Sequence, residues 1–211
     1  MGEQATFEQV ARLRTGGRPL GFDPDAVLET VVGLFWRHGY TGTSMADIEA
    51  ATGLKRTSLY NYFGSKDDLI AAALAMYVKL VSERVTDPLL NGSAGLDDLD
   101  AFFSHLGAMA TAPGSPDGCL VLSYIEELAS IERFVDTPRE HVERFNASLT
   151  GALDRAAALG EIPASSVERR ARLLEAAVIG INVTQPAFEG DDATRAAIEA
   201  IREEIKDWRQ G

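Results

Sequence analysis

The sequence predicts an all-α protein in which a small N-terminal helical head is joined by a linking helix to a larger helical domain. Along most of the chain, apolar residues recur at intervals of three and four, which is the spacing of one helix face. No segment shows the alternation of apolar and polar residues that marks a half-buried strand. Glycine, proline and capping residues separate the periodic segments, where helices are expected to begin and end.

Composition limits the class of protein. Hydrophobic residues make up 45% of the 211 residues, which is ample for a packed core. No apolar run approaches the roughly 18 residues that a membrane helix needs, and the N-terminus lacks the pattern of a signal peptide. The single cysteine excludes an intramolecular disulfide. We therefore expect a cytoplasmic protein.

The first segments read in order as an arm and a helix. Residues 1–21 hold much glycine and arginine, and we expect a flexible basic arm there. In the helix that follows, Asp23 is the expected cap, Pro24 occupies the first turn, and Gly39 marks the end. The apolar stripe of this helix is expected to consist of Val27, Leu28, Val31, Val32 and Phe35.

Residues 43–66 read as two short helices hinged at a glycine. Ser44 is expected to cap the first helix, with Asp47 closing a capping box. Gly53 supplies the left-handed backbone of a tight turn, and Leu54 should fill the corner. The buried face of the first helix is expected to consist of Met45, Ile48 and Ala51.

The second helix of this pair has an unusual outer face. Leu59 and Phe63 should point inward, four residues apart. A merely solvated face normally carries Glu and Lys, whereas Thr, Ser, Tyr and Asn suit phosphates and base edges. We therefore favour a DNA-binding helix-turn-helix over an ordinary helical hairpin. The candidate DNA contacts are Thr43, Ser44, Lys55, Arg56, Thr57, Ser58, Tyr60, Asn61, Tyr62 and Lys66.

The net charge of −12 is unevenly distributed. Residues 1–66 hold seven Lys or Arg against seven Asp or Glu, whereas residues 67–211 hold 13 basic and 25 acidic residues. All of the excess negative charge therefore lies outside the DNA-binding head. Within the arm, Arg12, Arg14 and Arg18 either stay solvated or touch the phosphates or the minor groove.

Many spaced residues of the head match one family signature. They are Gly39, Tyr40, Thr43, Ser44, Ile48, Gly53, Leu59, Tyr60, Asn61, Tyr62, Phe63, Ser65 and Lys66. On these residues the segment from Phe22 to about Tyr77 resembles the TetR/AcrR family of transcriptional regulators. Two positions depart from the pattern: Lys55 stands where the family usually has a capping Ser or Thr, and Thr57 stands where a small residue such as Gly is frequent.

The resemblance implies a homodimeric repressor that binds a palindromic DNA operator and releases it when an unknown small molecule binds the second domain. We expect three parts: a flexible basic arm over 1–21, a DNA-binding domain over 22–66, and a ligand-binding and dimerisation domain over 67–211. The alternative is a small-molecule-binding or protein-interaction module that keeps the hairpin only as a folding unit.

The second domain reads as a series of helices. A linking helix should begin at Ser65, run to about Val85 and end before Asp87-Pro88. Further helices are expected over about 96–111, 119–134 and 138–159, the last striped by Val142, Phe145, Leu149 and Leu153.

Two final helices carry apolar residues at seam-like spacing. Either a single intramolecular core or a four-helix dimer interface explains such spacing, and the resemblance favours the dimer. The seam residues are Val167, Ala171, Leu174, Val178, Ile181, Ile198, Ile201, Ile205 and Trp208.

A ligand pocket in this domain is expected to combine apolar and aromatic residues with a few polar groups. Each candidate taken alone is more simply explained as core or interface. The candidates are Phe102, Phe103, His105, Leu106, Met109, Cys119, Tyr124, Glu126, Phe145, Asn146, Asn182 and Gln185.

The sequence gives little support for catalytic or metal-binding activity. The sequence contains no nucleophile elbow, phosphate-cradling glycine loop or zinc-protease motif. Three isolated histidines and one cysteine do not form a zinc site. We expect no enzyme activity, no metal and no cofactor. Cys119 is expected at a helix start, either as a small buried residue or as a thiol that senses oxidants or electrophiles.

Overall fold

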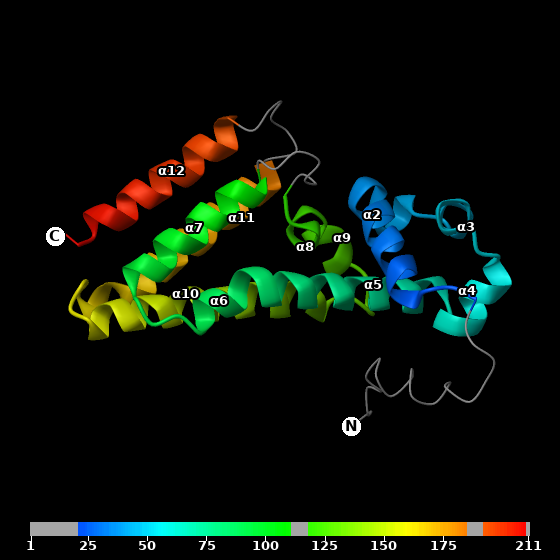
Figure 1. Ribbon diagram of the computed structural model, residues 1–211, viewed down its shortest axis with the longest axis horizontal. Helices are drawn as coiled ribbons and strands as arrows, with labels where there is room; N and C mark the ends of the chain where they lie inside the picture. The colour runs from blue at the N-terminus through cyan, green and yellow to red at the C-terminus, as the bar shows by residue number, and fades with distance from the viewer. Residues whose placement is uncertain (1–20, 111–117, 185–191, 210–211) are drawn as a thin grey trace, which may run out of the picture. The chain divides into compact units, whose positions relative to one another are not determined.

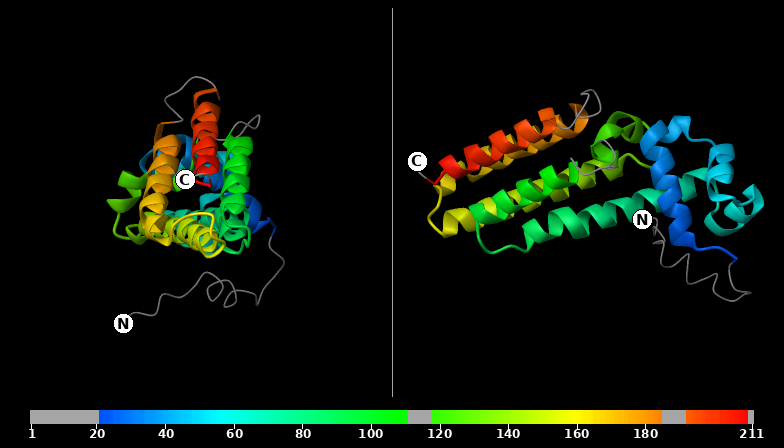
Figure 2. Two further views of the ribbon diagram at one scale, coloured as in Figure 1. Left: turned by 90° about the vertical axis from the view of Figure 1, so that its left-hand side faces the viewer. Right: turned by 45° about the horizontal axis from the view of Figure 1, so that its top comes forward.

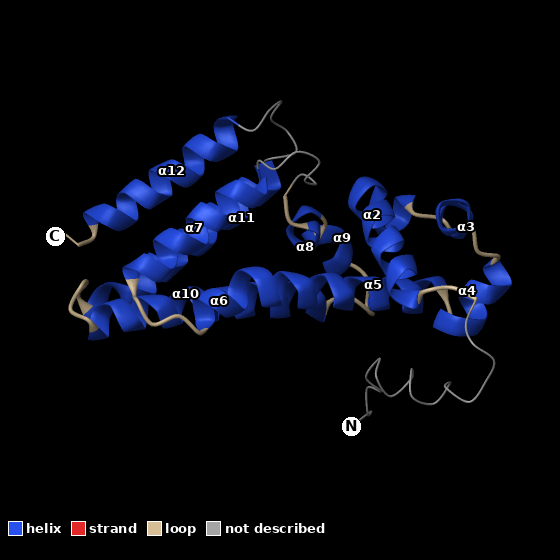
Figure 3. Ribbon diagram, viewed as in Figure 1, coloured by secondary structure: helices blue, strands red, loops and turns tan. Residues whose placement is uncertain are grey.

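A computed structural model of the chain describes residues 21–110, 118–184 and 192–209. Every regular element within these ranges is helical and none is a strand (Figures 1 and 3), so the all-α prediction is confirmed. The arginines of the arm and Gln185 lie outside the described residues.

Contacts within the chain divide it into two units, and the division falls between Tyr77 and Val78. The first unit contains α2 (Pro24–Gly42), α3 (Met45–Thr52), α4 (Arg56–Phe63) and most of α5 (Lys66–Val81). The second contains a π-helical turn (Ser82–Thr86), α6 (Asp87–Leu90), α7 (Leu96–Ala110), α8 (Leu120–Ser123), α9 (Ile125–Ala129), α10 (Asp136–Ala158), a 3₁₀ turn (Ala164–Ser166), α11 (Val167–Thr184) and α12 (Asp192–Asp207).

The first helix begins as its sequence predicts and is interrupted at the predicted Gly39, although α2 continues to Gly42. The Asp23 side chain accepts a hydrogen bond from the Asp25 N–H at 3.0 Å, and Pro24 opens the helix. At Gly39 the backbone leaves helical geometry with φ 68° and ψ −178°, which a residue with a Cβ rarely adopts. Val32 was expected in the apolar stripe but is only half-buried. Leu34, which was not expected there, is buried in the core.

The α3–α4 corner also follows the prediction, with one exception. Gly53 adopts φ 69° and ψ 6°, and its N–H donates to the Glu49 carbonyl at 2.9 Å. Met45 and Ile48 are buried, but the prediction for Ala51 was wrong because Ala51 is exposed. Two successive steps of three turn a residue out of the stripe, since a helix turns about 100° per residue.

The linking helix begins at Ser65 as expected but does not stop where expected. Ser65 and Asp68 form a reciprocal capping box, with the Asp68 N–H donating to Ser65 Oγ at 3.1 Å. The predicted break at Asp87-Pro88 was wrong, because a π-helical turn and then α6 continue the helix to Leu90. Pro88 directly follows the π-helical turn, at the second position of α6, and has no N–H to donate there.

In the second unit, α12 packs along α7 and α10 packs along α11 (Figure 2). These four long helices share one hydrophobic core that includes the fully buried Leu99, Phe103, Leu149 and Leu153. The expected helices over 96–111 and 138–159 are confirmed as α7 and α10. In the stripe of α10, Phe145, Leu149 and Leu153 are buried, whereas Val142 is only half-buried.

The seam residues of the last two helices belong to this intramolecular core. Seven of the nine are buried within the single chain, and the partly buried Ile181 and Ile201 pack against the same cluster. Most of these side chains therefore have little area left for a partner subunit, and the assignment of the seam to a dimer interface stays a prediction. Their three-four spacing follows from burying one helix face, whichever chain covers that face.

The segment after Gly118 is less regular than predicted. Instead of one helix over 119–134, two short helices, α8 and α9, flank Tyr124, whose φ of −119° and ψ of 28° are not helical. Both segments still bury apolar side chains, among them Leu120, Val121 and Leu128. Apolar spacing therefore indicated the buried residues but not the break between them.

Two arginines connect the helices of the second unit. Arg155 on α10 donates to Asp98 at 3.2 Å and to the Leu89 and Leu90 carbonyls at the end of α6. Arg202 on α12 makes two bonds to Asp100 on α7, at 2.9 and 3.0 Å. The hydrogen bond from Arg202 lowers the pKa of the Asp100 carboxyl.

No helix in the described ranges is both long enough and apolar enough to cross a membrane.

We expect Gly53→Ala to lower the free energy of unfolding by about 1–2 kcal/mol, because a Cβ is disfavoured at this left-handed position. No heavy atom would lie within 4 Å of that Cβ, so the loss reports backbone strain alone. Gly53→Asn should lose less, since asparagine tolerates this conformation.

Urea unfolding followed by circular dichroism checks this prediction. Gly33→Ala on α2 is the matched control, because Gly33 has no left-handed φ and an added Cβ would make only an ordinary contact at 3.7 Å. Equal midpoints for the wild type and Gly53→Ala would contradict the strain argument.

Candidate nucleic-acid interface

Helix α4 presents a continuous polar and aromatic surface, which we call the α4 surface. Leu59 and Phe63 anchor the helix in the core, with 0% and 9% of their area exposed. The prediction that both side chains point inward is confirmed. The helix itself, Arg56–Phe63, contains no acidic residue. The α4 surface consists of Lys55, Arg56, Thr57, Ser58, Tyr60, Asn61 and Tyr62, of which Ser58 and Tyr62 are half-buried and the others are exposed.

Aromatic packing fixes one side of this surface. The Tyr62 ring packs edge-to-face against Phe22 at 5.5 Å and against Phe63 at 4.7 Å between ring centroids. These contacts hold the ring of Tyr62 in one orientation while Tyr60 remains 41% exposed. The two tyrosines therefore differ in freedom although they lie two residues apart.

Ser44 lies at the start of α3 in the predicted capping box. The Asp47 N–H donates to Ser44 Oγ at 3.2 Å, and the Ser44 N–H donates to Asp47 Oδ2 at 2.9 Å. The Ser44 hydroxyl also donates to Asp47 at 2.6 Å, and this bond lowers the pKa of the Asp47 carboxyl. Ser44 is exposed, but its hydroxyl already serves the cap.

Thr43 was a candidate DNA contact, but the structure buries its side chain. Its side chain is 0% exposed, and its hydroxyl donates to the Gly39 carbonyl at 2.6 Å. That bond satisfies a carbonyl at the point where Gly39 interrupts α2. Thr43 therefore closes the end of a helix from the interior.

Lys66 makes structural contacts with Tyr40 and keeps N–H donors for a further partner. Its ammonium donates to the Tyr40 carbonyl at 2.9 Å and lies 4.4 Å from the centre of the Tyr40 ring. The Tyr40 hydroxyl in turn donates to Asp67 at 2.7 Å. A lysine has three N–H donors, so Lys66 can keep this contact and still approach a phosphate.

Sequence reasoning missed Glu49. Its carboxylate on α3 accepts hydrogen bonds from the Arg56 N–H at 2.6 Å and from Arg56 Nε at 3.1 Å. The indirect signal was Lys55, which precedes α4 and makes no side-chain cap. A helix start without its own cap needs an acceptor from elsewhere.

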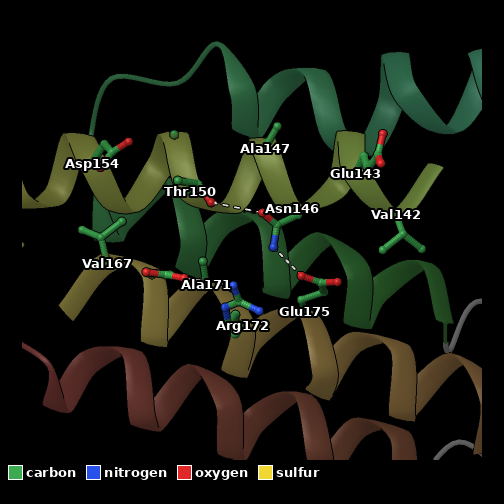
Figure 4. A pocket seen from close by; sticks show the side chains of 12 residues that line it. Val142, Glu143, Asn146, Ala147, Thr150, Asp154, Val167, Ala171, Arg172 and Glu175 are labelled. Carbon is green, nitrogen blue, oxygen red and sulfur yellow. Dashed lines mark hydrogen bonds and ion pairs between the residues drawn. The ribbon is translucent and has the colours of Figure 1, made fainter. Parts of the chain in front are cut away.

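The second unit contains a groove between α10 and α11 with a volume of about 730 Å³ (Figure 4). Asn146 points across it and donates to Glu175, while Thr150 donates to Asn146 at 3.4 Å. Apart from Arg172, the ionisable side chains that line this groove are acidic. They are Glu143, Asp154, Glu168 and Glu175.

The residues expected in a ligand pocket are not gathered in this groove. Among the members of the expected set that the structure describes, Asn146 alone lines it. Phe102, Phe103 and Phe145 are buried in the core, with the rings of Phe102 and Phe145 5.8 Å apart. Leu106 and Tyr124 are half-buried, and His105, Met109 and Glu126 are exposed.

Two further members of the expected set lie near the start of α8. Cys119 is half-buried and directly precedes this helix, with its Sγ 3.5 Å from Nε2 of the buried His141. Asn182 is buried, and its side-chain N–H donates to the Val178 carbonyl one turn earlier in α11. That bond satisfies the amide nitrogen within its own helix.

Family models match both parts of the chain. Residues 27–73 match the model described as bacterial regulatory proteins, tetR family. Residues 95–201, which make up half of the chain, match a tetracyclin repressor-like C-terminal domain. The chain belongs to the TetR family. This assignment confirms the resemblance inferred from the residues of the head.

Individual TetR-family proteins are similar over most of their length. The HTH-type transcriptional repressor ComR of Escherichia coli (strain K12) is 29% identical over 174 residues, covering 81% of this chain and 83% of ComR. The uncharacterized HTH-type transcriptional regulator YezE of Bacillus subtilis (strain 168) is 30% identical over 154 residues, covering 69% of this chain and 77% of YezE.

A solved structure is similar over both units of this TetR-family chain. A cysteine mutant of the TetR family transcriptional regulator CifR, complexed with 26bp double-strand operator DNA, has a TM-score of 0.79 and 25% identity. The similarity covers 89% of this chain and 98% of that CifR chain.

Thr43→Val should lower the free energy of unfolding by about 1–3 kcal/mol, because the buried Gly39 carbonyl loses its hydrogen bond. DNA affinity and its salt dependence should stay unchanged below the melting temperature. Urea unfolding and fluorescence anisotropy of labelled DNA measure the two quantities.

Thr30→Val is the matched control for this variant. The Thr30 hydroxyl also donates to a carbonyl four residues earlier, that of Ala26 at 2.9 Å, but at an exposed site. We expect its effect to stay within about 0.5 kcal/mol. A Thr43→Val protein that keeps its stability and loses DNA affinity would return Thr43 to the interface.

Proposed function

We propose that this chain is a homodimeric, ligand-responsive transcriptional repressor that binds a palindromic operator in the cytoplasm. The observation that carries the proposal is the α4 surface, a largely exposed set of hydrogen-bonding and aromatic side chains on the second helix of a glycine-hinged pair. Such a helix fits the major groove. Membership of a family of regulatory proteins supports regulation rather than catalysis.

Within the α4 surface, position along the helix suggests different roles. The N-terminal residues of a recognition helix contact base edges, so we assign base contacts to Arg56, Thr57, Ser58 and Asn61, with Arg56 favouring guanine. Tyr60, Tyr62 and Lys66 are assigned to phosphates. Lys55, which directly precedes α4, and Ser44, which is exposed at the start of α3, complete the proposed interface.

Charge sets the expected strength of binding. The formally neutral head carries few cations to neutralise phosphates, and the excess negative charge belongs to residues 67–211. Non-specific affinity should therefore be modest. A second copy of the head doubles the contacts when the operator is palindromic, which supports a dimer.

The described surface of α11 offers a face for a second copy, in place of the buried seam. Leu173 is 53% and Val183 is 50% exposed, although both are large and apolar. Ala176 and Gly180 lie between them on the same exposed stripe at steps of three and four. We propose that these four residues, here called the α11 face, pack against the partner subunit.

The effector is proposed to bind the second unit. The α10–α11 groove is one candidate site, and its acidic lining would suit a guest that carries positive charge. Binding there would favour one arrangement of the subunits, and the difference in affinity between the two arrangements would set the response.

Replacing two residues of the α4 surface should separate base contacts from phosphate contacts. Asn61→Ala should weaken binding to the operator by about 1–3 kcal/mol with little change on random duplex. Tyr60→Phe removes only a hydroxyl and should weaken both by a similar amount, about 0.5–1.5 kcal/mol.

The operator is first recovered by selection from random duplexes with the wild-type protein. Anisotropy titrations at several salt concentrations then compare the variants, with Lys79→Ala on the exposed part of α5 as a control. A wild-type protein that selects no sequence at low salt would favour the helical module without specific DNA binding.

Leu173→Glu should convert the dimer into a monomer, because it places a charge within an apolar contact. The monomer should also lose most of its operator affinity. Leu159→Glu is the matched control, since Leu159 is 60% exposed at the end of α10. Size-exclusion chromatography with light scattering measures the mass, and a dimeric Leu173→Glu protein would rule out the α11 face.

A further inference from the structure

The first turn of α4 needs a hydrogen-bond acceptor that its own sequence does not supply. The first N–H groups of a helix have no partner within the helix, and a Ser, Thr, Asp or Asn at the preceding position usually accepts from one of them. Here that position is Lys55, whose side chain has no acceptor and makes no cap. An ordinary cap would serve the second or third N–H of the helix, so the first N–H, that of Arg56, needs an acceptor from outside α4.

Glu49 provides this acceptor across the turn. One carboxylate oxygen accepts from the Arg56 N–H at 2.6 Å, and the other accepts from Arg56 Nε at 3.1 Å. The backbone carbonyl of Glu49 also accepts from Gly53, the residue that ends α3. A single residue therefore holds the end of α3, the start of α4 and the guanidinium of Arg56 (Figure 1 shows the two helices).

The geometry of the pair leaves part of the arginine available. Among the described contacts, the ion pair to Glu49 engages Nε. An arginine carries five N–H donors, so the two terminal nitrogens can still reach the O6 and N7 atoms of one guanine. Arg56 keeps 49% and Glu49 31% of side-chain exposure, so the pair lies at the surface that faces DNA in our proposal.

We propose that Glu49 is the positioning residue of the recognition helix: it caps α4 in place of Lys55 and holds Arg56 in the orientation that reads one base pair. This inference rests on the proposed DNA-binding function. The two roles are separable, because capping acts on the stability of α4 whereas the grip on the guanidinium acts on base preference. Its carboxylate also lowers the positive charge near the phosphates, which disfavours non-specific binding.

Three variants test the two roles. Glu49→Ala removes the cap and the grip on Arg56. Glu49→Ala combined with Lys55→Ser restores a cap of the ordinary kind but not the grip. Glu49→Gln keeps an oxygen acceptor for the Arg56 N–H and removes the negative charge, so it remains folded if the alanine variants do not.

The measurements are the melting temperature and the affinity for a panel of duplexes. The panel contains the operator recovered with the wild-type protein, every single-base-pair change in one half-site, and one random duplex. Arg56→Ala identifies the base pair that Arg56 reads, and Asn61→Ala shows whether the rest of the α4 surface still discriminates.

We expect Glu49→Ala to melt at a lower temperature and to lose about tenfold or more of its preference at the base pair identified by Arg56→Ala. The double variant should regain the melting temperature but not that preference. Glu49→Gln should melt close to the wild type and bind the random duplex more tightly, because one negative charge has gone.

Two results would overturn the inference while leaving DNA binding intact. One is an unchanged preference in Glu49→Ala at the base pair that Arg56→Ala affects. The other is a preference that returns in the double variant, which would reduce Glu49 to a cap. A wild-type protein without sequence preference would instead overturn the proposed function, and the inference with it.

Discussion

The α4 surface depends on how the chain satisfies its backbone groups at the α3–α4 corner. Gly53 permits the left-handed turn that ends α3, and Glu49 accepts from the first N–H of α4. Leu59 and Ile48 then fill the space under the two helices, each with no exposed area. Without these local bonds the apolar contacts would hold two helices together but would not define the direction of the outer side chains.

Local chemistry explains which features of the head could be predicted. The capping box of Ser44, the turn at Gly53 and the inward Leu59 each depend on neighbours within a few residues. Thr43 and Glu49 could not be assigned in this way, because their partners depend on how two helices meet. The fold class was predictable because apolar periodicity indicates which helix faces are buried. The break at Tyr124 was not predictable, because the same periodicity does not indicate whether the helix is continuous.

The second unit shows a different limit of sequence reasoning. A seam of Leu174, Val178 and Ile205 looks the same whether its partner is another helix of the chain or a second copy. The placement of α7, α10, α11 and α12 around one core accounts for the burial of this seam within a single chain. The exposed face of α11 carries smaller side chains than the buried seam, with Ala176 and Gly180 between Leu173 and Val183. Small residues allow two helices to approach closely, so a dimer built there would depend on close packing more than on deep apolar side chains.

Helix α11 then becomes the element through which an effector could act. Its inner face contributes Leu174 and Val178 to the core, its side contributes Glu175 to the α10–α11 groove, and its outer face carries Leu173. Protein interiors are close-packed, so a guest in the groove cannot displace α11 without repacking that core. Because the same helix carries the proposed contact with the partner subunit, a small shift of α11 would change the arrangement of two copies. Such coupling needs no separate relay between the effector site and the dimer, since both lie on one rigid element.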